Sequence, residues 1–144
     1  MLTYSLIHPE ILHALGTAGH GAQVLIADGN YPVITRSNPR AARVYLNLAP
    51  GLVTVTDVLK TLANAIPLEA AQVMGPDSSA VPSIFRDFRR ILPKEIQLER
   101  LGRFEFYEAA SAPAVALAIA TGEQRIYANI LLTIGVIPPP QGKL

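Results

Sequence analysis

The chain of 144 residues contains no cysteine, and charged side chains make up only 16% of it. The absence of cysteine excludes disulfides, thiolate metal sites and cysteine nucleophiles, and it is compatible with a cytoplasmic protein. So low a charge content is unusual for a soluble monomer and favours a homo-oligomer that buries surface between its subunits. The net charge of +1 gives no electrostatic footprint for nucleic acid or for an anionic membrane.

Long hydrophobic runs are missing as well. The longest stretch of small and apolar residues, 112–120, is far shorter than the roughly 20 residues that cross a bilayer as a helix. Residues 1–9 lack a basic segment followed by a long apolar run, so we expect no secretory signal, no membrane partner and a cytoplasmic location. Half of the residues are hydrophobic, which is enough for the core of a single domain over residues 1–144.

The hydrophobic pattern alternates between strand-like and helix-like segments. Helices are predicted over residues 9–15, 55–62, 84–92 and 104–110. Strands are predicted over residues 24–27, 44–48, 70–74, 96–100, 115–121 and 129–133. This alternation predicts an α/β fold, a single three-layer α/β/α domain with a mixed, mostly parallel sheet. The sheet is expected to be mixed because the last two strands, a few residues apart around Gly122, should form a hairpin.

The chain has three histidines, His8, His13 and His20. Their spacing does not match the separation of about four residues that pairs two ligands on a helix, so no metal site is predicted. His8 and His13 are interpreted as surface or capping residues. His20 is flanked by Gly19 and Gly21, which allow the backbone to turn sharply. The order of these glycines does not fit a dinucleotide-binding loop.

His20 and Asp28 each allow two interpretations. His20 can be a turn residue bonded to the backbone, or it can be functional, because Asp28 follows the next strand and ligands bind outside the carboxyl ends of strands. Asp28 precedes a glycine and can simply cap its own turn. Arg103 can form an ordinary surface ion pair. Tyr127 and Asn129 can be a strand-edge aromatic and a turn residue.

Three segments together are more specific than any single residue. They are Gly19-His-Gly21 with 27–32 (ADGNYP), 103–108 (RFEFYE), and 121–123 (TGE) with 127–136 (YANILLTIGV). In order and spacing, from about residue 9 to 136, the chain resembles the ribose pyranase / L-fucose mutarotase family and is closer to the L-fucose branch. Three positions depart from the fucose enzymes: Ala22 stands for their aspartate, Asn30 for the histidine of some, and Ala128 for their glycine.

The resemblance implies an isomerase that opens and recloses the ring of a free monosaccharide such as L-fucose. It implies that His20 donates and accepts the proton, and that Asp28, Arg103, Tyr127 and Asn129 bind the sugar. Mutarotation requires no cofactor, and a group that titrates near neutrality, as histidine does at about pH 6.5, suits the proton transfer. The family also implies a ring-shaped decamer with sites near subunit contacts.

Other interpretations remain open at this point. The chain can be a non-catalytic sugar-binding accessory protein of a sugar transport or utilisation system, or a D-ribose pyranase. The segment 103–108 resembles the fucose enzymes, whereas Ala128 is usual in the ribose enzymes; more weight goes to Arg103, which adds a charged, bidentate donor. In a purely structural oligomer, Asp28 and Arg103 would lie far from His20.

Overall fold

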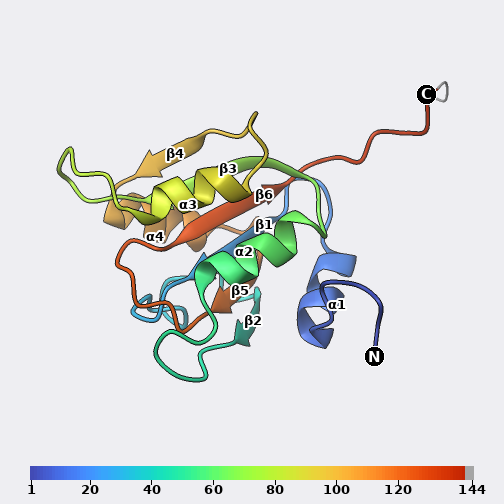
Figure 1. Ribbon diagram of the computed structural model, residues 1–144, viewed down its shortest axis with the longest axis horizontal. Coiled ribbons are helices and arrows are strands. Elements are labelled where there is room, and N and C mark those ends of the chain that lie inside the picture. Colours follow the sequence, from blue (N-terminus) through green and yellow to red (C-terminus); the bar gives the residue numbers. More distant parts are fainter. Residues whose placement is uncertain (142–144) are drawn as a thin grey trace.

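The computed structural model describes residues 1–141. Residues 142–144, the end of the single domain predicted over 1–144, lie outside the described residues. The elements follow the chain in this order (Figure 1): α1 (Pro9–Thr17), β1 (Gln23–Ala27), β2 (Ala42–Tyr45), α2 (Val55–Ala63), β3 (Leu68–Met74), α3 (Ile84–Ile91), β4 (Leu98–Leu101), α4 (Arg103–Ala110), β5 (Val115–Ala120) and β6 (Ile130–Ile134). Every predicted helix and strand is present, with ends that shift by a few residues.

The helices begin where local chemistry allows. Pro9 occupies the first turn of α1, and the His8 ring accepts a hydrogen bond from the backbone N–H of Ile11 at 3.4 Å, which confirms the capping interpretation of His8. At the start of α2, Thr54 and Asp57 form a capping box, in which each side chain satisfies a backbone N–H that the helix leaves free.

Six strands form one sheet in the order β2-β5-β1-β6-β3-β4. β1 pairs in parallel with β5 and β2 with β5, and β3 pairs in parallel with β4. β6 runs antiparallel to both of its neighbours, β1 and β3. Five strands therefore point one way and one points the other, as a mixed, mostly parallel sheet requires.

The predicted hairpin between the last two strands is wrong. β1 lies between β5 and β6, with Val24 facing Leu117 on one side and Leu132 on the other. β1 is almost wholly buried, and a buried strand needs hydrogen-bond partners along both edges. The connection 121–129 is long enough to pass over the end of β1 and insert β6 on its far side.

Helices cover both faces of the sheet (Figure 1). One core joins α1, α2 and α3 to one face, and its largest fully buried side chains include Leu59, Ile84 and Phe88. A smaller core joins α4 to the other face through Phe106 and Tyr107. No helix within residues 1–141 is long and apolar enough to cross a membrane.

Candidate functional site

The carboxyl end of the parallel strands carries a polar pocket of about 230 Å³. Because β1, β3 and β4 are parallel, the residues that follow them meet at one edge of the sheet, where ligands bind in folds of this kind. β6 runs the other way and brings the residues before it to the same edge. The pocket is lined by Asp28, Asn30, Tyr31, Met74, Arg103, Tyr107, Ile126, Tyr127 and Asn129. All four residues expected to bind sugar are among them.

Asp28 and Asn129 hold each other in a reciprocal pair. The backbone N–H of Asp28 donates to Asn129 Oδ1 at 2.8 Å, and Asn129 Nδ2 donates to Asp28 Oδ2 at 3.0 Å. Both residues are buried. The pair joins the end of β1 to the start of β6 and fixes both polar side chains in one orientation, which is what a recognition site requires.

The second oxygen of Asp28 explains the turn after β1. Asp28 Oδ1 accepts the backbone N–H of Asn30 at 3.0 Å, the aspartate turn that the sequence offered as its simpler interpretation. The turn interpretation of Asp28 is therefore confirmed, and it is compatible with the place of this residue in the pocket lining. Burial raises the pKa of Asp28, against the lowering effect of the hydrogen bonds from Asn30 and Asn129. At neutral pH the pocket presents a carboxylate that is partly stripped of water.

Arg103 is the first residue of α4, and its side chain packs against the ring of Tyr107. Its Nε donates to the hydroxyl of Tyr107, one turn further along α4, at 3.2 Å. Its guanidinium lies 5.7 Å from the centre of the Tyr107 ring, close enough for a cation–π contact. Tyr31 packs edge-on against Tyr107, with ring centres 5.5 Å apart. No ion pair of Arg103 occurs in the described structure, so its remaining donors are free for a ligand.

His20 lies at the opposite end of the sheet from this pocket. The N–H of Gly21 bonds to the carbonyl of Ile134, the last residue of β6, at 2.9 Å, whereas Asp28 is paired to Asn129, just before β6. The strand rise of about 3.4 Å per residue puts these two anchor points about 17 Å apart. The sequence interpretation that placed His20 beside Asp28 therefore fails within one chain, because β1 separates them.

The side chain of His20 has a partner that the sequence did not reveal. Its Nε2 lies 2.9 Å from Oε2 of Glu69 on β3, and the two side chains are 59% and 45% exposed. A carboxylate bonded to one ring nitrogen fixes which tautomer the imidazole adopts. Glu69 follows a proline and a leucine in an ordinary strand pattern, so nothing in the sequence marks it. This pair forms an exposed acid/base group at the amino end of the sheet.

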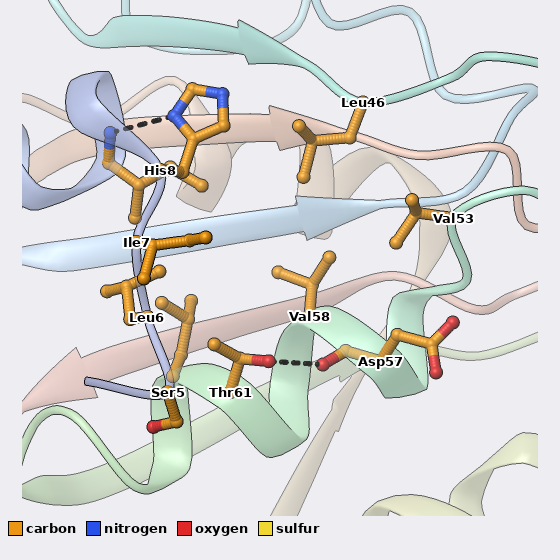
Figure 2. A pocket seen from close by; sticks show the side chains of 11 residues that line it. Ser5, Leu6, Ile7, His8, Leu46, Val53, Asp57, Val58 and Thr61 are labelled. Carbon is orange, nitrogen blue, oxygen red and sulfur yellow. Dashed lines mark hydrogen bonds between the residues drawn. The ribbon is translucent and has the colours of Figure 1, made fainter. Parts of the chain in front are cut away.

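A second hollow, between residues 5–8 and α2, is apolar and lacks such chemistry (Figure 2). Its two ionisable residues both cap helices: His8 caps α1, and Asp57 accepts a hydrogen bond from the backbone N–H of Thr54 at 3.0 Å at the start of α2. Among residues 1–141, no group of three His, Asp or Glu side chains is arranged to hold a metal ion. The polar pocket at the carboxyl edge is therefore the better candidate.

The chain matches a known protein family along almost its whole length. The family model described as the RbsD / FucU transport protein family matches residues 1–137. The chain belongs to the RbsD / FucU family. Among the curated relatives in this family, the fucose mutarotase of Danio rerio is 31% identical over 95% of this chain and 94% of its own length. The fucose mutarotase of Bos taurus is 33% identical over 94% and 92%.

Solved structures of RbsD / FucU proteins have the same fold. The fucose mutarotase of Streptococcus pneumoniae, solved in complex with L-fucose, superposes with a TM-score of 0.80 at 27% identity over 96% of this chain and 100% of that one. RbsD of Bacillus subtilis, solved in complex with D-ribose, gives a TM-score of 0.82 at 23% identity over 96% and 100%. The α/β fold with a mixed, mostly parallel sheet is thereby confirmed, as is the family resemblance.

Proposed function

We propose that this chain is a cofactor-independent monosaccharide mutarotase, an isomerase that interconverts the anomers, and by the same chemistry the ring forms, of a free aldose such as L-fucose. The observation that carries the proposal is the polar pocket, in which Asp28, Arg103, Tyr127 and Asn129 converge from three separate segments. Relatives of more than 30% identity that span nearly the whole chain are fucose mutarotases.

The four pocket side chains match the surface of a sugar. The Asp28 carboxylate can accept two hydroxyl protons, and Arg103 offers a rigid fork of donors. Asn129 both donates and accepts. The ring of Tyr127 can lie along the apolar face of a sugar while its hydroxyl bonds a polar group. Tyr107, Met74 and Ile126 line the same pocket and supply apolar surface for carbons that carry no hydroxyl group.

Ring opening then needs one group that removes the proton of the anomeric hydroxyl and one proton delivered to the ring oxygen. We assign this transfer to His20. Bonded to Glu69, its imidazole can take up a proton from the sugar and return it. The ring opens to the aldehyde, the C1–C2 bond rotates, and closure on either face gives either anomer. Closure on a different hydroxyl changes the ring size.

Because His20 lies at the far end of the sheet, the proposal requires two copies of the chain. The exposed His20–Glu69 pair of one subunit would face the pocket of the next, so that one copy binds the sugar and its neighbour moves the proton. A contact between opposite ends of identical subunits is heterologous, and it forms a ring when the rotation from one subunit to the next closes. This agrees with the low charge content and with the decamer that the family resemblance implies. A purely structural oligomer was also expected to keep Asp28 far from His20. Under this proposal the two residues are far apart within one subunit but meet between neighbouring subunits.

The runner-up is a non-catalytic sugar-binding accessory protein, and the transport role in the family's description favours it. Both functions need the pocket, but only the enzyme needs His20. We further propose that the chain acts as one domain over residues 1–144 in the cytoplasm, where free aldoses enter metabolism.

The test is magnetisation-exchange NMR on a panel of free aldoses that includes L-fucose, galactose and ribose. The enzyme accelerates exchange between anomers above the buffer rate in the presence of a chelator. A protein that binds one of these sugars by calorimetry but leaves every exchange rate at the buffer value is the accessory protein instead.

A further inference from the structure

The loop 121–129, which joins β5 to β6, carries three of the residues that line the pocket, Ile126, Tyr127 and Asn129. Its first residue is anchored by the Thr121 hydroxyl, which donates to the carbonyl of Ala27 at 2.8 Å, and its last by the pairing of Asn129 with Asp28. Tyr127 lies between these anchors and has a φ of +59°. A residue other than glycine rarely adopts this left-handed backbone conformation, and it does so where the surrounding structure holds it there.

The middle of the loop is clamped by Glu123 and Arg125. Oε1 of Glu123 accepts from both the backbone N–H and Nε of Arg125, at 3.0 and 2.9 Å, and Oε2 accepts from Nη2 at 2.8 Å. The Glu123 carboxylate is buried. Burial alone would raise the pKa of Glu123, but the hydrogen bonds and charge of Arg125 outweigh it and hold that pKa below its ordinary value.

The same guanidinium ties the loop to the helical layer. Nη1 of Arg125 donates to Oδ2 of Asp87 on α3 at 2.9 Å, and Nη2 lies 3.4 Å from the hydroxyl of Thr56 on α2. A planar fork that meets two carboxylates in fixed directions leaves its own backbone little freedom. Arg125 is absent from the lining of the polar pocket and lines a separate hollow together with Ile126 and Tyr127.

We infer that Arg125 is a positioning residue for the pocket: by bridging Glu123 and Asp87 it fixes the loop, and so sets the left-handed backbone of Tyr127 and the direction of its ring. The inference rests on the proposed function of the pocket. It assigns Arg125 no contact with the sugar. Its loss should weaken sugar binding without slowing the proton transfer of His20.

The test compares Arg125→Gln with Arg90→Gln. Arg90 is the matched control, because it also lies near Asp87, at 3.8 Å, but is 70% exposed, and among the described residues its ion pairs include none with the loop. In exchange assays, Arg125→Gln should raise KM roughly tenfold, the effect of one misplaced hydrogen bond, with kcat nearly unchanged. Arg125→Lys, which keeps the charge without the fork, should lie between. Arg90→Gln should match the wild type.

A second readout does not depend on catalysis. In the free protein labelled at its tyrosine rings, the Tyr127 signal, assigned with Tyr127→Phe, should move in Arg125→Gln and stay in place in Arg90→Gln. If Arg125→Gln does not fold, Asp87→Asn releases the same guanidinium from α3 and should shift KM and the Tyr127 signal in the same direction by less.

Two results would overturn the inference: a folded Arg125→Gln protein with an unchanged KM and Tyr127 signal, or a fall in kcat with unchanged KM that persists once rates are expressed per folded protein. A wild-type protein without exchange activity would defeat the proposed function alone. The Tyr127 signal would still decide whether Arg125 positions the pocket.

Discussion

The two ends of the sheet are built in opposite ways. At the carboxyl end, Asp28 and Asn129 are buried, doubly bonded to each other and placed in a pocket. At the amino end, His20 and Glu69 are exposed, joined only to each other, and absent from that pocket. Groups that recognise a ligand must be held in place before it arrives. A group that only moves a proton can stand on a surface, provided that a neighbouring subunit brings the ligand to it.

The largest effect should come from the amino end. His20→Ala should slow sugar exchange by about 10²–10⁴-fold, the usual contribution of a positioned acid/base group, while L-fucose binding measured by calorimetry stays near the wild-type value. His13→Ala, which alters another exposed histidine, is the control. An active His20→Ala protein would move the proton transfer elsewhere, and Tyr127 would then be the first residue to examine.

The carboxyl end should show the converse pattern. Asp28→Asn removes a charged acceptor and should weaken L-fucose binding by roughly 10–100-fold, the worth of a charge-assisted hydrogen bond. Asp77→Asn, at an exposed aspartate, should bind as the wild type does. If Asp28→Asn binds sugar normally but exchanges it slowly, the division of labour between the two ends is wrong.

Binding should also depend on pH through Asp28. Its pKa is raised from 3.8, chiefly by burial, so the folded protein takes up this proton at a higher pH than an ordinary aspartate does. As the pH falls through the raised pKa, the carboxylate is neutralised and sugar binding weakens. Titration calorimetry at several pH values should show this weakening beginning above pH 3.8 and should show it absent in Asp28→Asn. Binding that holds steady down to that pH would argue against a sugar contact of Asp28.

The sequence located the elements well because each has a strong local signal. The buried stripe of α3 and the continuous apolar run of β1 needed no tertiary information. Asp28 could be placed at the carboxyl edge because it follows a predicted strand, whereas Arg103, Tyr127 and Asn129 came from the family resemblance. What the sequence could not predict depends on pairing between distant strands. The insertion of β6 beyond β1, the distance from His20 to Asp28 and the partner Glu69 all follow from that pairing.

The ion pairs of Arg125 with Glu123 and Asp87, which hold the 121–129 loop, could not be predicted from the sequence either. Glu123 and Arg125 are two residues apart, a spacing that in most loops means two solvated side chains. Only the packing of α3 against the loop brings Asp87 to within 2.9 Å of Arg125 and turns the pair into a bridge. An ion pair that depends on three separate segments leaves no mark in any one of them.

Acid should loosen the clamp that Arg125 forms with Glu123 and Asp87. The pKa of Glu123 is lowered from 4.5, so its pairing stabilises the fold at neutral pH, and this contribution is lost as the pH falls below 4.5 through the lowered value. The free energy of unfolding of Arg125→Gln should be lower than that of the wild type by on the order of 1 kcal/mol at neutral pH, a figure that allows for solvent screening of the arginine. Thermal unfolding at pH 7 and in acid should show this gap closing at low pH. An equal gap at both pH values would mean that the arginine acts through packing alone.

The smallest effect concerns the substrate. L-fucose carries a methyl group that ribose lacks. Phe106 is fully buried in the core, whereas Tyr107 lines the pocket and can supply apolar surface for this methyl group. Burying one methyl is worth about 0.8 kcal/mol, roughly fourfold in rate. L-fucose should therefore exchange modestly faster than ribose at equal enzyme and sugar concentrations. A clearly faster ribose rate would favour the D-ribose pyranase, in line with Ala128.

Subunit complementation tests most directly whether one active site joins opposite ends of two subunits. His20→Ala, which exchanges sugar slowly, and Asp28→Asn, which binds it weakly, are mixed by reassociation and assayed at sugar concentrations too low to saturate Asp28→Asn. Assembly is verified by sedimentation against the 15.4 kDa of a single chain. Random mixing should give a complete site at about one contact in four and restore that share of wild-type exchange. Mixed oligomers that are no more active than their parents, or a wild-type enzyme that exchanges sugar as a 15.4 kDa monomer, would contradict the account.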